Sequence, residues 1–294
     1  MSEKKNEIRI ISPSGVIDSD YIEGAIQVLT GWGFKVTEGR FARMAYGRFA
    51  GTAEERVKDL QEAIDDDQLV AIMCSRGGYG LTQIIDDVDF SALRRSPKWL
   101  IGFSDITVIH NVLSNQNIPS IHGIMTKHLT ELVEDSMSVK SLKDVLFGKS
   151  PVYEIAPFHE NRNGYAKGKL IGGNLSVIMG LRGTSYDLIY DNAILFIEDI
   201  GERAYHIDRM LQNLRLGGVF SKLAGLIVGH FTDCDEDPLM KMTIREMIQN
   251  AVAGYDFPVC FGFPAGHENE NYALILGREI QLTISGEKSV VDFR

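Results

Sequence analysis

Apolar residues in the first half of the chain alternate between short β-branched runs and stretches with helical spacing. Five extended runs are predicted as strands, at residues 8–11, 34–36, 69–73, 99–101 and 118–121. Between several of them, apolar residues recur three and four positions apart, which is typical of amphipathic helices. Strands that alternate with helices form a parallel sheet with helices on both faces. The pattern therefore predicts an N-terminal α/β domain.

The second half of the chain has a different pattern. Over residues 149–165 the periodicity lapses, prolines and mixed charges appear, and we expect a linker. This linker divides an N-terminal domain at residues 1–148 from a C-terminal domain at residues 166–294. Beyond residue 258, short apolar runs follow one another closely. Their crowding predicts a smaller, β-rich α/β domain with a sheet that is at least partly antiparallel.

The composition fits a globular protein of this kind and excludes some partners. Of the 294 residues, 44% are apolar and 24% are charged, which leaves room for two domains with cores of their own. The formal net charge is −10. Nucleic acids and anionic membrane surfaces bind cationic faces, so we expect neither as a partner.

The sequence indicates a compartment as well. Residues 1–6 are charged and lack the apolar core of a signal peptide, and no apolar run approaches the roughly 20 residues of a membrane span. The three cysteines, Cys74, Cys234 and Cys260, are odd in number and widely spaced. This spacing favours a reducing compartment over a disulfide framework. We expect a cytoplasmic protein.

A serine stands where the predicted strand at residues 99–101 turns into a helix. Ser104 follows Gly102 by two residues, and a helical pattern begins directly after it. On such a turn the hydroxyl is lifted clear of the sheet, close to backbone N–H groups and to the positive end of the helix. This position suits a nucleophile. Serine is also a preferred N-cap residue, so an ordinary helix cap explains the same pattern.

A glycine-rich loop follows the predicted strand at residues 69–73. Its sequence is Arg76-Gly77-Gly78-Tyr79-Gly80. Glycines allow positive φ and close approach of the backbone to a ligand, so the loop is either a tight turn or a donor of N–H groups to an oxyanion. The dinucleotide fingerprint fails because Gln83 stands where a third glycine is needed, and no P-loop sequence occurs. We expect no nucleotide cofactor.

Two further positions offer the acid and the base that a nucleophilic serine needs. Glu198 directly follows the apolar run at residues 193–197, and sheet enzymes place functional groups at the carboxyl ends of strands. An ordinary surface carboxylate explains Glu198 equally well, and Glu202 is a rival for its role. His267 lies in a glycine-flanked loop, the kind of segment that often carries catalytic residues, and His122 is a weaker rival.

Ser104, Glu198 and His267 occur in the chain order nucleophile, acid, base. The α/β-hydrolases have the same order. The turn at Ser104 nevertheless has Ile106 in place of the second glycine of the hydrolase pattern Gly-x-Ser-x-Gly. The elbow is therefore not that of a standard α/β-hydrolase.

Five motifs extend in order along nearly the whole chain, at residues 76–80, 102–105, 168–176, 197–209 and 262–267. Together they resemble the LD-carboxypeptidases and their relatives, the microcin C immunity hydrolases. The resemblance implies an N-terminal α/β domain with the serine, a smaller β-rich domain with the glutamate and the histidine, and a homodimer. One departure is Ile275, where the family is expected to have proline.

The resemblance also implies a role for each candidate residue. Ser104 looks like the nucleophile, His267 like the general base, and Glu198 like the carboxylate that orients the histidine. No metal and no cofactor is implied.

The resemblance suggests which groups hold the oxyanion, and side-chain chemistry suggests which groups bind a substrate carboxylate. Backbone N–H groups of Asp105 and of Gly77 or Gly78 would hold the oxyanion. Arg76 and Arg203 are candidates for binding a terminal carboxylate, because a guanidinium suits a bidentate carboxylate partner.

The substrate that the resemblance implies is a small peptide, the murein tetrapeptide. It would be cut between the L-centre of a diamino acid (L-Lys or diaminopimelate) and the terminal D-Ala. An immunity amidase acting on acyl-adenylate analogues is an alternative, although the short linker and His122-Gly123 look more like the carboxypeptidase branch. From a different class, a two-lobed protein that binds a small molecule without catalysis is also an alternative.

Overall fold

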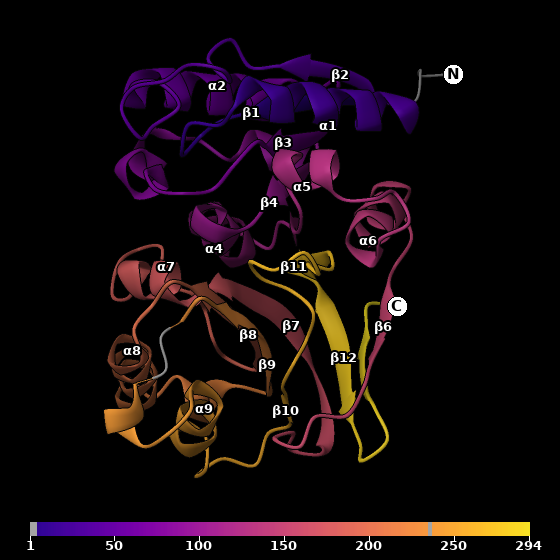
Figure 1. Ribbon diagram of the computed structural model, residues 1–294. Helices are drawn as coiled ribbons and strands as arrows, with labels where there is room; N and C mark the ends of the chain where they lie inside the picture. The colour runs from indigo at the N-terminus through magenta and orange to yellow at the C-terminus, as the bar shows by residue number, and fades with distance from the viewer. Residues whose placement is uncertain (1–4, 235–236) are drawn as a thin grey trace.

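The protein consists of two halves, each built on its own sheet with associated helices (Figure 1). The computed structural model describes residues 5–234 and 237–294, so part of the charged N-terminal segment lies outside the described residues. The N-terminal part of the chain, coloured indigo to magenta in Figure 1, forms one half, and most of the C-terminal part forms the other. This mixed α/β architecture confirms the predicted fold class.

The first sheet has the strand order β11-β5-β4-β3-β1-β2. Its strands are β1 (Glu7–Ile11), β2 (Lys35–Glu38), β3 (Leu69–Cys74), β4 (Trp99–Gly102), β5 (Ser120–His122) and β11 (Leu274–Leu276). The helices of this half are α1 (Ser19–Gly31), α2 (Ala53–Asp65), α3 (Ala92–Arg95), α4 (Thr107–Asn115), α5 (Thr126–Glu131) and α6 (Met137–Leu146). Strands β1 to β5 are parallel, which explains the continuous apolar runs in the sequence, since parallel strands are buried on both faces.

The second sheet has the strand order β10-β9-β8-β7-β12-β13-β6. Its strands are β6 (Val152–Ile155), β7 (Gly164–Asn174), β8 (Ala193–Ile200), β9 (Gly225–Thr232), β10 (Val259–Cys260), β12 (Glu279–Ile284) and β13 (Ser289–Asp292). The helices are α7 (Leu175–Leu181), α8 (Ala204–Leu216) and α9 (Ile244–Ala251). Strands β7 to β10 are parallel, whereas β12, β13 and β6 are antiparallel to their neighbours. The prediction of a partly antiparallel sheet is confirmed.

Strand β6 lies within residues 149–165, where the sequence suggested a linker without regular structure. It forms the edge of the second sheet and pairs with β13. Tyr153 in this strand is buried, and its hydroxyl donates a hydrogen bond of 2.7 Å to the carbonyl of Ala273. Four residues between two prolines show no period of their own, so tertiary contacts determine this strand.

Strand β11 belongs to the first sheet, although it lies far along the second half of the chain. It is antiparallel to β5, and Ile275 stands opposite Ile121. The predicted C-terminal domain therefore contributes one strand to the N-terminal sheet. Ile275, the departure from the expected proline, is a buried residue of this strand.

Buried contacts join the two halves. One hydrophobic cluster contains Ile101 and Ile121 from the first sheet and Phe196 and Ile227 from the second. Where β7 ends, the backbone N–H of Asn174 donates a hydrogen bond of 3.0 Å to Thr107 Oγ1, at the start of α4. These contacts fix the turn before α4 relative to the second sheet.

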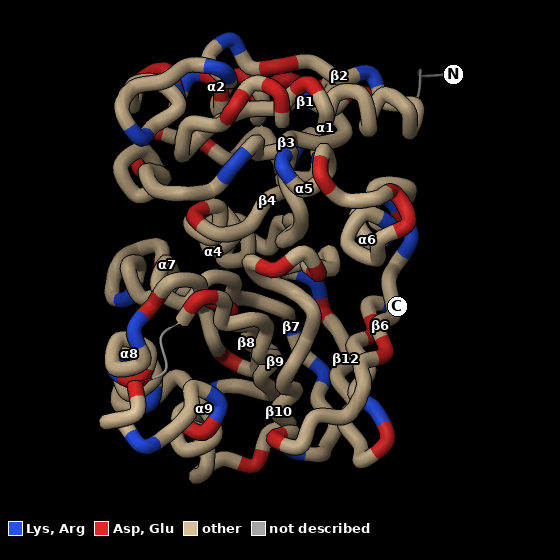
Figure 2. Tube along the Cα trace, viewed as in Figure 1, with Lys and Arg blue, Asp and Glu red and all other residues tan. Residues whose placement is uncertain are grey.

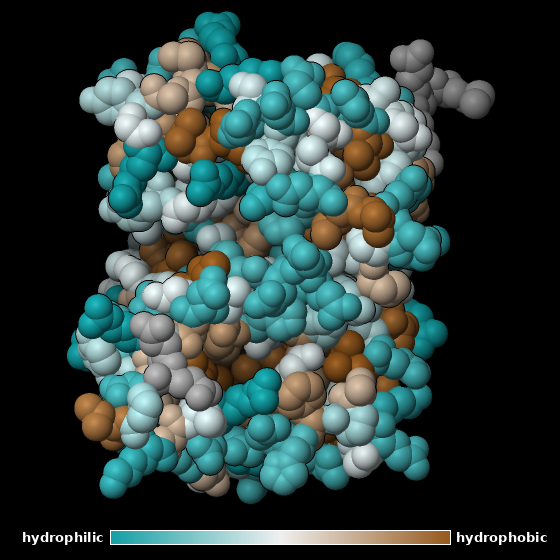
Figure 3. Space-filling model, in the orientation of Figure 1, coloured by the Kyte–Doolittle hydropathy of each residue, from teal (hydrophilic) through white to brown (hydrophobic). Residues whose placement is uncertain are grey.

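Acidic and basic residues are distributed over both halves of the molecule (Figure 2). The face of the molecule shown in Figure 3 is mainly polar. Hydrophobic side chains form separate patches on this face. No helix in the described part of the chain is both long and apolar enough to cross a membrane.

Replacing Thr107 with valine tests the contact between the halves. Thr107 is fully buried, so the variant leaves the N–H of Asn174 without an acceptor at nearly unchanged side-chain volume. We expect the free energy of unfolding, measured by chemical denaturation, to fall by about 1–3 kcal/mol. Thr107→Ser keeps the hydroxyl and should lose less. A valine variant as stable as the wild type would contradict this role.

Candidate active site

Ser104 lies on a sharp turn between β4 and α4. Its φ is +66°, a left-handed conformation that costs a non-glycine residue about 1–2 kcal/mol. A short 3₁₀ helix (Ser104–Ile106) begins at the serine, and α4 follows directly. The residues preceding these two helices are Phe103 and Ile106, and neither provides a side-chain cap. Ser104 is thus held in a strained conformation rather than serving as an N-cap.

The glycine-rich loop after β3 lies against this serine. A methyl group on Gly77 would lie 2.7 Å from Ser104 Cβ and 2.9 Å from its Oγ, so only glycine allows this approach. In residues 5–234 and 237–294, no acceptor is found for the N–H of Gly77 or Gly78. Gly77 lies directly against Ser104, so these unpaired backbone donors remain candidates for the predicted oxyanion site.

The carboxylate of Asp105 holds this arrangement together, a role that the sequence did not indicate. Asp105 is buried and accepts hydrogen bonds from Ser14 Oγ (2.5 Å) and from the backbone N–H of Leu81 (3.0 Å). Burial raises the pKa of this carboxyl, and the hydrogen bond from Ser14 opposes that rise. The side chain ties the loops after β1 and β3 to the turn at Ser104.

Glu198 and His267 form a hydrogen-bonded pair. Glu198 stands near the end of β8 and is fully buried, and its Oε2 lies 2.7 Å from Nδ1 of His267 in the loop after β10. Gly266, with φ of +136°, lets this loop pass close to the carboxylate. Because Nδ1 is paired with the glutamate, Nε2 is the ring nitrogen that remains available for proton transfer.

Glu202 is placed elsewhere. Its Oε2 lies 3.0 Å from Nδ1 of His206, one turn further along the chain. The structure therefore brings Glu198, and not Glu202, to His267. Sequence spacing did not decide between them because both residues follow the apolar run at residues 193–197.

The pair lies close to the serine turn. The ring of Phe103, the residue before Ser104, is 4.8 Å from the ring of His267, edge to face. Within the described part of the chain, Ser104 Oγ has no hydrogen-bond partner. The hydrogen bond between a serine hydroxyl and its histidine base is often long or poorly aligned before substrate binds. The geometry is therefore compatible with a serine–histidine relay.

Two other histidines lie around Phe103: His122 is fully buried and His128 is half-buried. His122 and His128 lie 5.8 Å and 5.4 Å from its ring, between centroids. Burial lowers the pKa of His122 well below its ordinary value and lowers the pKa of His128 to about 4. Both imidazoles are therefore neutral at neutral pH. Among the described residues, neither ring nitrogen of His122, the rival predicted from sequence, has a hydrogen-bond partner, whereas His267 is paired with Glu198.

Arg76 and Arg203 are both exposed. Arg76 Nη1 donates a hydrogen bond of 2.8 Å to the carbonyl of Val16, and Arg203 precedes α8. Neither guanidinium has a carboxylate partner among the residues that the structure describes. Both are free to bind an anion. No group of three or more side chains able to hold a metal ion is found in the same residues.

Comparison with known proteins agrees with this architecture. The family model for the LD-carboxypeptidase N-terminal domain matches residues 8–123, and that for the LD-carboxypeptidase C-terminal domain matches residues 167–282. The probable murein peptide carboxypeptidase of Bacillus subtilis is 30% identical over 98% of this chain and 92% of its own length. The murein tetrapeptide carboxypeptidase of Pseudomonas aeruginosa is 31% identical over 92% of this chain and 91% of its own length.

Solved structures give the same result. The muramoyltetrapeptide carboxypeptidase from Oxalobacter formigenes superposes with a TM-score of 0.90 at 27% identity, over 97% of this chain and 98% of its own. The microcin immunity protein MccF, in complex with glutamyl sulfamoyl guanosine, has the same fold, with a TM-score of 0.87 at 21% identity, over 99% and 96% of the two chains. The chain therefore belongs to the LD-carboxypeptidase family and is a serine carboxypeptidase.

Proposed function

We propose that this protein hydrolyses the amide between the L-centre of a diamino acid and the terminal D-Ala of murein tetrapeptides, with Ser104, His267 and Glu198 as catalytic triad. The observation that carries the proposal is the buried pair of Glu198 and His267 beside a strained serine turn. Relatives named as murein peptide carboxypeptidases support the substrate class.

The hydrogen bond to Glu198 fixes the tautomer of His267. With its proton on Nδ1, the imidazole has a lone pair on Nε2, which takes the proton of Ser104 as the hydroxyl attacks the amide carbonyl. Glu198 then stabilises the imidazolium that forms. The imidazolium gives its proton to the departing amine of D-Ala, and water completes hydrolysis of the acyl-enzyme.

Backbone groups stabilise the charge on the tetrahedral intermediate. The N–H groups of Gly77 or Gly78 and of Asp105 would donate to the oxyanion; the close approach of Gly77 to Ser104 and the position of Asp105 directly after the serine support this role. Arg76 or Arg203 would bind the carboxylate of the terminal D-Ala, since each guanidinium is exposed and without an acidic partner in the described residues.

Replacing Ser104 with alanine tests the nucleophile. We expect kcat for D-Ala release to fall by roughly 10⁴- to 10⁶-fold while the protein stays folded, because the covalent step is lost but the packing is kept. Release from synthetic tetrapeptides with L-Lys or diaminopimelate is followed by mass spectrometry. A serine-reactive fluorophosphonate should label the wild type and not the variant. Undiminished D-Ala release by Ser104→Ala would refute the serine mechanism.

The acid is tested by a matched pair of glutamine variants. Glu198→Gln should lower kcat by about 10²- to 10⁴-fold, because the amide no longer stabilises the imidazolium. Glu202→Gln should leave kcat within about threefold of the wild type, since its partner is His206. Steady-state kinetics on both variants decide the matter. If Glu202→Gln is the damaging change, the assignment of Glu198 is wrong.

Gly77→Ala tests the close approach of the glycine loop. The added methyl group would displace the hydroxyl of Ser104, so we expect kcat to fall by about 100-fold or more at similar thermal stability. Gly123→Ala is a matched control, because its methyl group would meet its nearest neighbour at 3.4 Å, an ordinary contact. Wild-type kinetics for Gly77→Ala would exclude this loop from the oxyanion site.

A further inference from the structure

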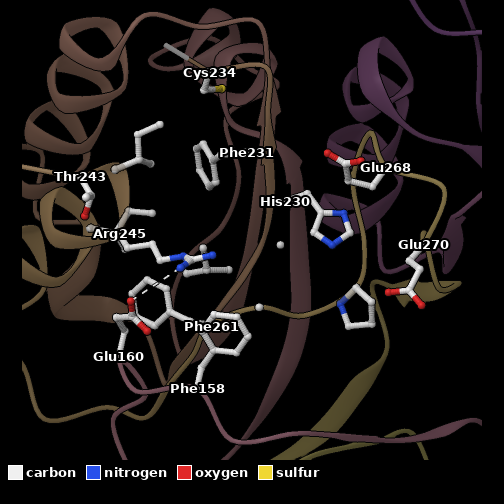
Figure 4. A pocket seen from close by; sticks show the side chains of 16 residues that line it. Phe158, Glu160, His230, Phe231, Cys234, Thr243, Arg245, Phe261, Glu268 and Glu270 are labelled. Carbon is white, nitrogen blue, oxygen red and sulfur yellow. Dashed lines mark ion pairs between the residues drawn. The ribbon is translucent and has the colours of Figure 1, made fainter. Parts of the chain in front are cut away.

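A cavity of about 630 Å³ lies beside the loop that carries His267 (Figure 4). Pro264 and Glu268, which flank His267 in the sequence, line it, as does His230 at the end of β9. A methyl group placed on Gly266 would lie 3.1 Å from His230 Cβ and 3.1 Å from Glu198 Oε2. The wall of the cavity is thus a close neighbour of the Glu198–His267 pair.

One wall of the cavity is aromatic and carries a neutralised cation. Phe231 and Phe261 line it, together with Phe158. Arg245 lies 5.0 Å above the ring of Phe158 and forms an ion pair of 3.8 Å with Glu160, drawn as a dashed line in Figure 4. The positive charge of Arg245 is therefore already partnered.

The opposite wall, next to His267, has negative charge without a partner. In Figure 4, Glu268 and Glu270 lie on the side of His230, away from Arg245. Neither carboxylate forms an ion pair with any residue that the structure describes. Burial lowers the pKa of His230 despite these carboxylates, so its imidazole is neutral at neutral pH and does not compensate them. A ligand with a cationic group would therefore bind this part of the cavity most favourably, because it would pair with the free carboxylates.

An aromatic wall and free carboxylates together suit an aliphatic chain that ends in an ammonium group. We propose that the cavity receives the side chain of the diamino acid at the scissile bond, and that Glu268 and Glu270 bind its terminal ammonium. The inference rests on the proposed function, in which the carbonyl of that residue lies between Ser104 and His267. Glu268 directly follows His267, so one loop carries both the proposed base and a carboxylate of the cavity.

The test compares two peptides, one ending in L-Lys-D-Ala and one in L-norleucine-D-Ala, which lacks the ammonium. Their dissociation constants are measured by calorimetry on Ser104→Ala protein, so that no turnover occurs. We expect the lysine peptide to bind about three- to tenfold more tightly at low salt, and the difference to shrink as salt is added.

Charge-removing variants in the same Ser104→Ala protein locate the effect. Glu268→Gln with Glu270→Gln should abolish the preference for lysine and leave the norleucine peptide unaffected. Glu62→Gln with Glu287→Gln removes two exposed carboxylates elsewhere and should keep the preference. Equal binding of the two peptides, or a preference that survives Glu268→Gln with Glu270→Gln, would overturn the inference.

Turnover by the wild type separates this inference from the proposed function. If the carboxylate-dependent preference for lysine is found but wild-type protein releases no D-Ala, the ammonium site stands and the carboxypeptidase proposal fails. If D-Ala is released but the preference is absent or independent of Glu268 and Glu270, the carboxypeptidase proposal stands and the ammonium site fails.

Discussion

The candidate site depends on the hydrogen bond between Glu198 and His267. Glu198 is fully buried, and its second oxygen, Oε1, has no partner in the described residues. A carboxylate in such surroundings is costly unless a charged or hydrogen-bonding group meets it. His267 does so at 2.7 Å, and it does so most strongly as an imidazolium. The cost of burying Glu198 is therefore offset most fully when His267 has taken a proton, which is the state that attack by a serine creates.

In the proposed mechanism the pair of Glu198 and His267 acts only if Ser104 is held close by, and Ser104 comes from the other half of the chain. The hydrogen bond between Asn174 and Thr107 fixes the start of α4 against the second sheet. The buried carboxylate of Asp105 fixes the turn against two neighbouring loops. A serine with φ of +66° stores strain that these contacts must balance. These contacts thus account for the persistence of the left-handed conformation at Ser104.

The sequence predicted the parts of this structure that depend on local pattern. The parallel strands, the turn at Ser104 and the loop at His267 follow from periodicity and glycine placement. Pattern did not predict strand β6 or the return of β11 to the first sheet, because short strands are determined by the surface they pack on. Nor did it separate Glu198 from Glu202, since the choice depends on which side chain reaches a loop almost seventy residues away. The role of Asp105 was likewise hidden, because its partners lie in two distant loops.

The net charge of −10 describes the whole chain but not the surroundings of the site. Arg76, without an acidic partner in the described residues, adjoins the glycine loop that touches Ser104. Glu268 and Glu270, equally unpaired there, follow His267. In the proposed binding mode, a peptide with a carboxylate on one side of the scissile bond and an ammonium on the other would be attracted at both ends. In that binding mode, charges of opposite sign at the two ends of the site would set the direction of a bound peptide, because a reversed peptide would place like charges together.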